Sequence, residues 1–495
     1  MVTLATWEQL REAERRFPFA DGGISLMAAA AGALAARIRE IGKFPVWFLC
    51  GPGNNGGDGL WVAALLRKED PSYSCAVLRV YPEIPYIGDA AEGWKAVLEA
   101  GVPVYDADGP QDSLPGLVVD AIFGIGGGAR PFDKRVKRLL TRAARWKEQG
   151  ARILACDIPS GLSQAGAVQP ETLAADETLT FLAGKAGLLL YPGRRYAGIV
   201  REITFSTVNE DLFTGQALYP SDIPSLLPQR PEWGHKGTFG HTGVLAGSRG
   251  MSGAGALCGL GALHSGCGKV TWLHPDFPVQ LPYCLMEQLL PGEKELIPSA
   301  LSDLNDVLPD FQALAVGPGL GRSPATAETL AALLPKLRMP VVLDADGIWN
   351  LAGITFPSGM RGVMTPHPGE MARFLSCGTD DVTGDLLSAA LKAAEKTGLV
   401  VLLKGAVTVI ADPEKRFALL PLPNSGMATA GSGDVLSGIL AGLLARGMEP
   451  WDAARLGGLL HAAGGAWAAS TLGASYMTAE DILSGLRADH CGFQW

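Results

Sequence analysis

Short apolar runs alternate with longer amphipathic stretches along the first part of the chain. Runs rich in Val, Ile, Leu and Cys predict buried strands at residues 46–49, 75–80, 117–122 and 153–156. Apolar residues recur at helical spacing at residues 60–68, 89–100 and 134–147. Strands that alternate with helices are typical of a parallel sheet covered on both faces. We therefore expect a three-layer αβα sandwich in this region.

The same alternation returns after a segment at residues 212–234 that lacks a periodic pattern. Prolines crowd this segment, at Pro220, Pro224, Pro228 and Pro231. Beyond it, apolar runs predict strands at residues 244–246, 269–273, 314–316, 341–343 and 400–403. Helical spacing predicts helices at residues 255–265, 324–334, 382–397, 435–446 and 450–470. We therefore expect two tandem α/β domains, at residues 1–218 and 219–495.

The composition narrows the class of function. The 495 residues carry a net charge of −9, so the chain has no basic surplus with which to neutralise a nucleic acid. The eight cysteines form no CxxC pair, which favours reduced thiols. The first residues lack a signal-peptide pattern, and no apolar run is long enough to span a bilayer. We expect a cytoplasmic protein that binds neither nucleic acid nor membrane.

Three polar, glycine-rich segments in the first half follow predicted strands. They read G-P-G-N-N-G-G-D-G at residues 51–59, D-A-I-F-G-I-G-G-G-A-R at residues 120–130 and D-I-P-S-G at residues 157–161. Ligands bind beyond the carboxyl ends of strands in an open parallel sheet, so we expect these loops to converge. Their oxygen atoms suit a hard cation, and their glycines let a phosphate approach the backbone. Tight strand-to-helix turns without a ligand would give similar segments.

These segments resemble the N-terminal domain of the YjeF-type NAD(P)H-hydrate epimerases. The resemblance implies a Rossmann-like domain that interconverts the R and S forms of hydrated NADH and NADPH (NADHX and NADPHX). It implies a potassium ion bound by Asn55, Asp120 and Ser160, and Asp157 as the catalytic acid–base group. It also implies that the hydrate contacts Asp157 and a larger set: Asn54, Asn55, Gly56, Gly57, Asp58, Gly124, Ile125, Gly126, Gly127, Gly128, Ala129 and Arg130.

The first half departs from the family pattern in its early helix. The family has L-M-E-x-A-G there, whereas residues 26–32 read L-M-A-A-A-A-G and lack the acid. This change concerns helix contacts and not the loops at the strand ends. Lys185 lies where the family often has a lysine.

Residues 429–438 read T-A-G-S-G-D-V-L-S-G and precede an apolar helical stretch. The free N–H groups at a helix start bind anionic oxygen, so we expect Gly431, Ser432 and Gly433 to face a phosphoryl group. Asp434 is better suited to act as a base toward the hydroxyl that meets the phosphoryl group. The segment therefore predicts a ribokinase-like phosphoryl-transfer site.

Further segments with polar residues and glycines accompany the predicted strands of the second half, at residues 234–254, 317–321, 344–347, 365–370 and 404–408. With residues 429–438 they resemble the ribokinase-like ADP/ATP-dependent NAD(P)H-hydrate dehydratases. The resemblance implies that the hydrate contacts Ala254, Gly319, His367 and catalytic Asp434. It implies that the nucleotide contacts Lys404, Gly405, Ala406, Val407, Thr408, Gly431, Ser432 and Gly433.

A magnesium ion is expected to bridge the nucleotide phosphates. Asp344 and Asp346 of the D-A-D-G segment would orient that ion through water, or the segment forms a simple strand-end turn, which we favour slightly. Four histidines are interpreted as packing or surface residues: His264, His274, His461 and His490.

These motifs together predict a repair enzyme that epimerises NADHX and NADPHX and dehydrates the S form. The nucleotide is expected to be ADP, with ATP as the alternative, and a homo-oligomer is compatible with the family. The main competing hypothesis is a ribokinase-like small-molecule kinase fused to a non-catalytic nucleotide-binding domain. The segments at residues 234–254 and 365–370 argue against that kinase.

Overall fold

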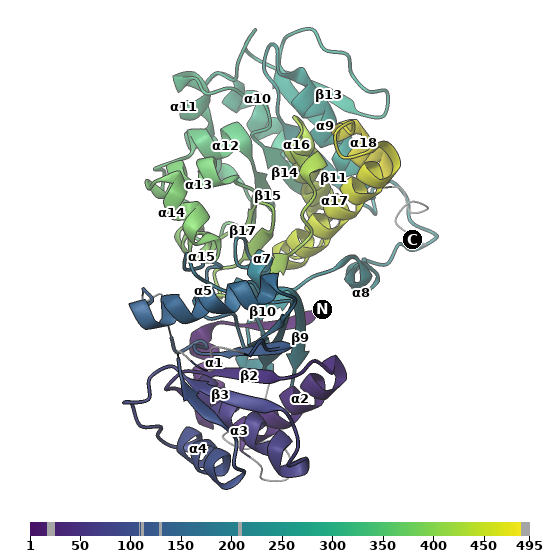
Figure 1. Ribbon diagram of the computed structural model, residues 1–495. Coiled ribbons are helices and arrows are strands. Elements are labelled where there is room, and N and C mark those ends of the chain that lie inside the picture. Colours follow the sequence, from purple (N-terminus) through teal and green to yellow (C-terminus); the bar gives the residue numbers. More distant parts are fainter. Residues whose placement is uncertain (17–24, 108, 110–112, 128–130, 206–209, 487–495) are drawn as a thin grey trace. The chain divides into compact units, whose positions relative to one another are not determined.

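The computed structural model describes residues 1–16, 25–107, 109, 113–127, 131–205 and 210–486. The chain divides into two compact units, Val2–Gly215 and Gln216–Trp495, with Met1 grouped with the second (Figure 1). Each unit contains a sheet flanked by helices, which confirms the predicted α/β class.

The first unit is built on a parallel sheet with the strand order β4-β3-β2-β5-β6-β7-β9. Its strands are β2 (Val46–Cys50), β3 (Cys75–Arg79), β4 (Val104–Asp106), β5 (Leu117–Ala121), β6 (Arg152–Cys156), β7 (Glu177–Phe181) and β9 (Ile199–Ile203). The direction of strand addition reverses between β2 and β5. Such a switch point opens a crevice at the carboxyl ends of the two strands, where a ligand can bind.

Helices cover both faces of this sheet (Figure 1). One face carries α2 (Leu26–Ile41), α3 (Asn54–Glu69) and α4 (Asp89–Glu99), and the other carries α5 (Lys134–Glu148). Phe48 packs in the core on the α2–α4 side and Trp47 in the core on the α5 side. Neighbouring residues of a strand point to opposite faces, so both faces of β2 are buried.

One helix near the N-terminus and two short strands lie outside this main sheet. Strand β1 (Val2–Ala5) pairs in parallel with β8 (Gly184–Lys185), and helix α1 (Trp7–Arg16) follows β1. Leu10 and Ala13 of α1 are buried in a cluster with Leu182 and Leu188, which flank β8. The N-terminal segment and Lys185 thereby meet in one part of the unit.

The sheet of the second unit has the strand order β13-β12-β11-β14-β15-β16-β17-β18-β19. The first seven are parallel: β13 (Met286–Leu290), β12 (Lys269–Pro275), β11 (His241–Leu245), β14 (Ala313–Val316), β15 (Val341–Leu343), β16 (Gly362–Met364) and β17 (Val400–Leu403). The last two, β18 (Thr408–Ala411) and β19 (Phe417–Leu420), continue it as antiparallel strands. The parallel strands bring their carboxyl ends to one edge.

Two groups of helices cover this second sheet (Figure 1). The core of one face is formed with α9 (Ser252–His264), α16 (Ser432–Ala445), α17 (Pro450–Leu472) and α18 (Ala479–Gly485). The other group comprises α10 (Ala300–Val307), α11 (Pro324–Leu333), α12 (Ala345–Asn350), α13 (Pro368–Leu375), α14 (Thr379–Gly384) and α15 (Leu386–Thr397).

Helices α9 and α16 touch through their backbones. A methyl group on Gly438 would lie 1.9 Å from the carbonyl oxygen of Cys258, and one on Gly261 would lie 2.5 Å from that of Val435. Any side chain at either position would force the helices apart. The first half of α16 is therefore held against the second half of α9.

The prediction of one helix at residues 382–397 is wrong. The segment contains the end of α14 and all of α15, and Asp385 separates the two helices. Asp385 has an extended backbone, with φ −151° and ψ 79°, and its side chain accepts a hydrogen bond from the backbone N–H of Ser388. An aspartate that caps a new helix in this way competes with continuation of the previous one.

None of the helices in the described part of the chain combines the length and apolar character needed to cross a membrane.

Candidate active sites

A cavity of about 710 Å³ lies at the switch point of the first unit. Among its lining residues are eight of those predicted to bind the hydrate: Asn54, Asn55, Asp58, Gly124, Ile125, Gly126, Gly127 and Asp157. Gly56 and Gly57 lie behind this wall, in the first turn of α3, where both are buried. A methyl group on Gly56 would lie 1.9 Å from the carbonyl oxygen of Gly51. Gly128, Ala129 and Arg130 lie outside the described residues.

Asp157 and Lys185 form an ion pair at the cavity wall. The Lys185 Nζ lies 2.8 Å from Asp157 Oδ1, and the Lys185 side chain is only 2% exposed. The same ammonium group donates to Thr180 Oγ1 at 2.7 Å and to the Phe181 carbonyl oxygen at 3.0 Å. Asp157 itself has a left-handed backbone, with φ 69°. An aspartate tolerates this region better than most residues do. In this conformation its carboxylate points toward the lysine.

Two further acids line the same cavity. Burial, followed by the charges of Asp157 and Glu14, raises the pKa of Asp58 well above its usual range. Burial and the charge of Asp157 also raise the pKa of Glu14, while Lys185 and Arg11 oppose that rise. Three carboxyl groups thus lie close together in one cavity, where the charge of Asp157 raises the pKa of the other two, and Lys185 is paired with Asp157. Such crowding favours the protonated form of Asp58 and Glu14.

Glu14 was not predicted from the sequence, because it precedes every glycine-rich segment. Only its position in α1 could have indicated its place in the cavity. Leu10, Ala13 and Glu14 stand at helical spacing i, i+3 and i+4, and the first two are buried. An acid that continues an apolar stripe is a candidate for a cavity wall.

The predicted potassium ligands Asp120 and Ser160 are in direct contact. Ser160 Oγ donates to Asp120 Oδ1 at 2.5 Å, and the Ser160 backbone N–H donates to Asp120 Oδ2 at 2.8 Å. Both residues are buried, and burial raises the pKa of Asp120 while the Ser160 hydrogen bonds oppose the rise. Asp120 therefore has neutral hydrogen-bond partners here and no ion pair with any described lysine or arginine.

Asn55 approaches the same loop from α3. A methyl group on Gly124 would lie 3.3 Å from the Asn55 side-chain oxygen, and the neighbouring Phe123 N–H donates to Ser160 Oγ at 2.9 Å. The buried Asn55 Nδ2 has no hydrogen-bond partner among the described residues. The loop thus brings an unsatisfied amide near a buried carboxylate and hydroxyl.

The second site centres on the start of α16. Gly431 has φ 90° and turns the chain into the helix, which begins at Ser432. This confirms a helix at residues 435–446, although it starts three residues earlier. Gly433 and Asp434 lie in its first turn, and a methyl group on Gly433 would lie 3.3 Å from Lys404 Nζ. The loop and Lys404 therefore face each other.

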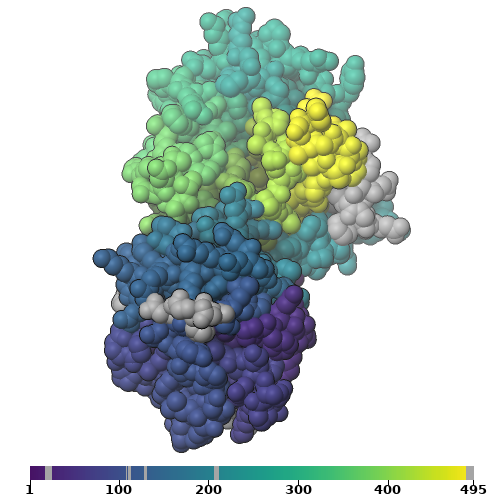
Figure 2. Space-filling view, viewed as in Figure 1, coloured from purple at the N-terminus to yellow at the C-terminus, as the bar shows by residue number. Residues whose placement is uncertain are grey.

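Figure 2 shows this face of the second unit hollowed between the green segments of α12–α15 and the yellow-green α16. The K-G-A-V-T segment, Lys404 to Thr408, makes the tight connection between β17 and β18. It carries the predicted nucleotide contacts Gly405, Ala406 and Val407. The structure thus places the two predicted nucleotide-binding segments together through Lys404 and Gly433.

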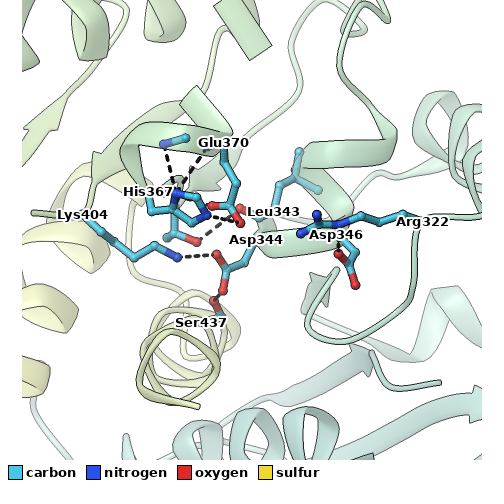
Figure 3. A network of polar contacts seen from close by, with 10 residues as sticks. Arg322, Leu343, Asp344, Asp346, His367, Glu370, Lys404 and Ser437 are labelled. Atoms are coloured by element: carbon cyan, nitrogen blue, oxygen red, sulfur yellow. Dashed lines mark hydrogen bonds and ion pairs between the residues drawn. The ribbon is translucent and has the colours of Figure 1, made fainter. Parts of the chain in front are cut away.

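Asp344 holds Lys404 in place (Figure 3). The Lys404 Nζ lies 2.7 Å from Asp344 Oδ1, and Ser437 Oγ donates to Asp344 Oδ2 at 2.7 Å. Burial lowers the pKa of Lys404, but the carboxylates of Asp344 and Glu370 outweigh it and the pKa is raised. Lys404 is therefore a permanent cation above the first turn of α16.

The D-A-D-G segment is not a simple turn, because α12 begins at Ala345 directly after Asp344. Asp346 accepts hydrogen bonds from the Gly321 N–H at 2.9 Å and from Arg322 Nε at 2.6 Å. Both oxygens of each aspartate therefore already have partners. Direct ligation of magnesium by either aspartate would compete with these contacts.

Asp434 differs from these paired acids. Its half-buried carboxylate accepts no hydrogen bond from any described residue. Burial, together with the charge of Asp344, raises the pKa of Asp434 to about 7, while Lys404 opposes the rise. A carboxylate with a pKa near neutrality is suited to accept a proton from a hydroxyl group.

His367 begins α13 and forms a reciprocal cap with Glu370. Its Nδ1 accepts from the Gly369 N–H at 3.0 Å, and the Glu370 carboxylate accepts from the His367 N–H at 2.9 Å. Since Nδ1 is an acceptor, Nε2 carries the proton of the neutral ring. Nε2 lies 3.3 Å from Glu370 Oε1, and the His367 side chain is 53% exposed.

The predicted contacts Ala254 and Gly319 are neighbours. Gly319 has φ 61°, and a methyl group on it would lie 3.0 Å from Ala254 Cβ and 2.9 Å from the Met251 carbonyl oxygen. Ser248 Oγ donates to the Gly319 carbonyl oxygen at 2.8 Å. The loops after β11 and β14 therefore meet at these residues.

His461 is more than the packing or surface residue that the sequence suggested. Its Nε2 lies 2.9 Å from the carbonyl oxygen of Ser432 and 3.2 Å from Ser432 Oγ. Burial lowers the pKa of His461 to about 4, so the ring is neutral. It therefore contacts the first residue of α16 from α17. Its place in an apolar helical stretch gave no sign of this contact.

Comparisons with known proteins match both halves of the chain. A family model described as NAD(P)H-hydrate dehydratase matches residues 242–487, and one described as YjeF-related protein N-terminus matches residues 23–187. The bifunctional NAD(P)H-hydrate repair enzyme Nnr of Moorella thermoacetica is 37% identical over 468 residues, with 90% of this chain and 87% of that protein covered. The protein of the same name from Escherichia coli is 32% identical over 448 residues, with 89% and 84% covered.

A solved structure of ADP/ATP-dependent NAD(P)H-hydrate dehydratase from Bacillus subtilis, co-crystallized with ATP/Mg²⁺, is 28% identical. It covers 55% of this chain and 96% of its own, with a TM-score of 0.44. The identity to the repair enzymes extends over nearly the whole chain, and both halves match the corresponding family models. The chain therefore belongs to the family of bifunctional NAD(P)H-hydrate repair enzymes.

Proposed function

We propose that this chain repairs hydrated nicotinamide cofactors in two steps, with residues 1–218 as the epimerase and residues 219–495 as the dehydratase. The first site interconverts the R and S forms of NADHX and NADPHX. The second site removes water from the S form and consumes a nucleotide. The observation that carries the proposal is Asp434, an unpaired acid with a pKa raised to about 7 beside Lys404 and the start of α16.

In the first site, Asp157 exchanges a proton with the hydrate. The Lys185 ammonium group fixes the direction of the Asp157 carboxylate through the ion pair. Asp58 and Glu14, whose pKa values are raised, act as the proton-bearing partners in the same cavity. An acid–base reaction at one carbon requires a proton acceptor and a proton donor. A carboxylate and a protonated acid in one cavity supply these two roles.

Potassium fits the first site by its donor set. A buried carboxylate with no cationic partner among the described residues, a buried hydroxyl and the side-chain oxygen of Asn55 are ligands of the kind that hard cations prefer. Asn55, Asp120 and Ser160 would hold the ion. It would supply positive charge near the anionic hydrate.

In the second site, Asp434 accepts the proton of the ring hydroxyl as that oxygen attacks the terminal phosphoryl group of ADP or ATP. Lys404 and the backbone N–H groups of residues 431–433 stabilise the negative charge on the transferring group. The P–O bond to the nucleotide breaks, which leaves AMP or ADP. The ring carbon then carries a phosphate ester in place of a hydroxyl.

The phosphate ester is the better leaving group. The ring nitrogen donates its electron pair, the C–O bond breaks, and inorganic phosphate departs. The adjacent ring carbon then loses a proton, which restores the dihydronicotinamide. His367 and the Ala254–Gly319 wall are placed to orient the ring during these steps.

Magnesium would enter with the nucleotide. Asp344 and Asp346 already have partners at both carboxylate oxygens, so they do not suit direct ligation. The ion would be held by phosphate oxygens and water, as is usual for magnesium. It would neutralise charge on the phosphates.

The test offers separated R and S hydrates of NADH to the purified chain with ADP, ATP or neither. We expect dihydronicotinamide absorbance to return from both epimers, and only when a nucleotide is present. Recovery without a nucleotide, or no recovery from the S form with either nucleotide, would contradict the proposal.

A further inference from the structure

Two arginines enclose the ring of Trp349 in the second unit. The guanidinium carbon of Arg322 lies 4.1 Å from the ring centroid, and that of Arg373 lies 3.8 Å from it. Two groups this close to one centroid cannot share a face, so the indole is held between them. Stacking on an aromatic ring fixes the plane of a guanidinium group while its N–H edges stay available.

The position of Arg322 is also fixed by hydrogen bonds. Its Nε lies 2.6 Å from Asp346 Oδ1 (Figure 3). Asn350 Nδ2 donates to the Gly321 carbonyl oxygen at 2.8 Å and thereby ties the preceding loop to α12. The two Nη atoms of Arg322 have no hydrogen bond to any described residue. These two groups are therefore oriented but unoccupied by protein.

Arg373 has neither an ion pair nor a side-chain hydrogen bond with a described residue, and it is exposed. It lies on α13, three residues after the buried Glu370 and six after the N-cap residue His367. Arg322 follows Gly319 by three residues on the loop after β14. Both arginines thus extend from segments that carry predicted hydrate contacts.

We propose that Arg322 and Arg373 form a phosphate-binding subsite for the dinucleotide hydrate, next to the ring-binding part of the second site. The proposal rests on the proposed function of that site. Each guanidinium group presents a planar pair of donors that matches phosphate oxygens. The chain carries a net charge of −9, so an anionic substrate needs such local cations.

The phosphate has two sources in these substrates. It is either the pyrophosphate, which NADHX and NADPHX share, or the 2′-phosphate, which NADPHX alone carries. The test measures KM and kcat for S-NADHX and S-NADPHX with wild type, Arg373→Ala and Arg373→Lys. Arg373→Ala should raise KM about 10-fold, since a charge-assisted hydrogen bond is lost, and should leave kcat nearly unchanged.

The two substrates separate the two sources. An equal rise in KM for both hydrates assigns the pyrophosphate, and a rise for S-NADPHX alone assigns the 2′-phosphate. Arg373→Lys should give a smaller rise, because it keeps the charge and loses the planar donors. Unchanged KM values for both hydrates, or a rise only in the KM for the nucleotide, would overturn the subsite.

Arg416→Ala is the matched control. Arg416 also lies over a tryptophan ring, 4.8 Å from the Trp451 centroid, and its Nε is 2.5 Å from Asp412. Its side chain is 48% exposed, as is that of Arg322. This variant should leave both KM values unchanged. An equal KM rise in the control would show that loss of any stacked arginine acts through the fold, which would also overturn the subsite.

A binding measurement separates this subsite from the proposed function. Adenosine 2′,5′-bisphosphate and inorganic pyrophosphate are titrated into wild type and Arg373→Ala by calorimetry. Weaker binding of at least one probe to the variant supports the subsite even if the wild type dehydrates neither hydrate. Equal binding of both probes to the two proteins, with active wild type, would remove the subsite and leave the dehydratase in place.

Discussion

The two sites occupy the same edge of their sheets but arrange their charges differently. In the first site, Glu14, Asp58 and Asp157 line one cavity, and only Asp157 forms an ion pair with the buried Lys185 among the described residues. In the second, acids have their own partners, as Asp344 has Lys404 and Asp346 has Arg322, while Asp434 is left unpaired. Crowded acids raise one another's pKa, whereas matched pairs single out one proton acceptor.

The largest effect is expected from Asp434→Asn. An amide cannot accept the hydroxyl proton, so kcat for dehydration of S-NADHX should fall about 1000-fold. Epimerisation of the R form by the same protein is the internal control and should be unchanged. A dehydration rate within a factor of about ten of wild type would show that Asp434 is not the base.

The ion pair between Lys404 and Asp344 in the second site predicts the next largest effect, a loss of stability. Lys404→Met leaves the buried Asp344 without its cation and should lower the free energy of unfolding by about 3 kcal/mol. Urea denaturation at pH 7 measures it. Arg361→Met breaks an exposed pair with Glu449 and should cost less than about 1 kcal/mol. Equal losses in the two variants would mean that burial of Asp344 does not matter.

The ion pair between Asp157 and Lys185 in the first site predicts a loss of epimerisation. Asp157→Asn should slow epimerisation about 100-fold and leave dehydration of the S form intact. It also leaves Lys185 buried and unpaired, so the double variant Asp157→Asn/Lys185→Met should recover stability but not epimerisation. If the double variant recovered the rate, Asp157 would act only by holding the fold.

The pH dependence of the second site follows from Asp434. The base acts in its ionised form, and its pKa is raised to about 7. Below that value, kcat/KM for dehydration should rise about tenfold per pH unit, and above it the rate should level off. Rates from pH 5.5 to 9 with S-NADHX check this. A profile that is flat across neutral pH would assign the proton transfer to another group.

The smallest effect concerns stability. Since the pKa of Asp434 is raised from 3.8 to about 7 in the folded state, that state binds more protons between these values and loses stability as the pH rises. Asp434→Asn should therefore raise Tm at pH 8, by about 2 °C, and leave it unchanged near pH 4. A variant that melts lower than wild type at pH 8 would contradict the direction of this shift.

Much of the fold followed from local apolar runs, as in β2, β5 and β15. Strand β7 did not, because its sequence E-T-L-T-F begins with an acid. Glu177 is 1% exposed and is paired with Arg37 and Arg201 at 2.6 and 2.7 Å. One of these partners lies on α2, far away in the sequence. A buried charge whose partner lies far away in the sequence leaves no local sequence pattern.

The same limit applies to the sites. The loops after the strands were visible because glycines and acids stand together in the sequence, as in residues 51–59 and 429–434. Glu14 and His461 come from helices whose relation to Asp157 and Ser432 is created only by packing. The break at Asp385 arises because helix capping competes with helix propagation. Hydrophobic periodicity gives no indication of this competition.

The backbone contact between α9 and α16 has a consequence for nucleotide binding. Because no side chain separates Gly438 from Cys258 or Gly261 from Val435, α16 packs directly against the backbone of α9, which fixes its position. The N–H groups at its start are therefore oriented before any nucleotide arrives. Little conformational entropy remains to be lost on binding, so nucleotide affinity reports the contacts themselves and not the cost of assembling the loop.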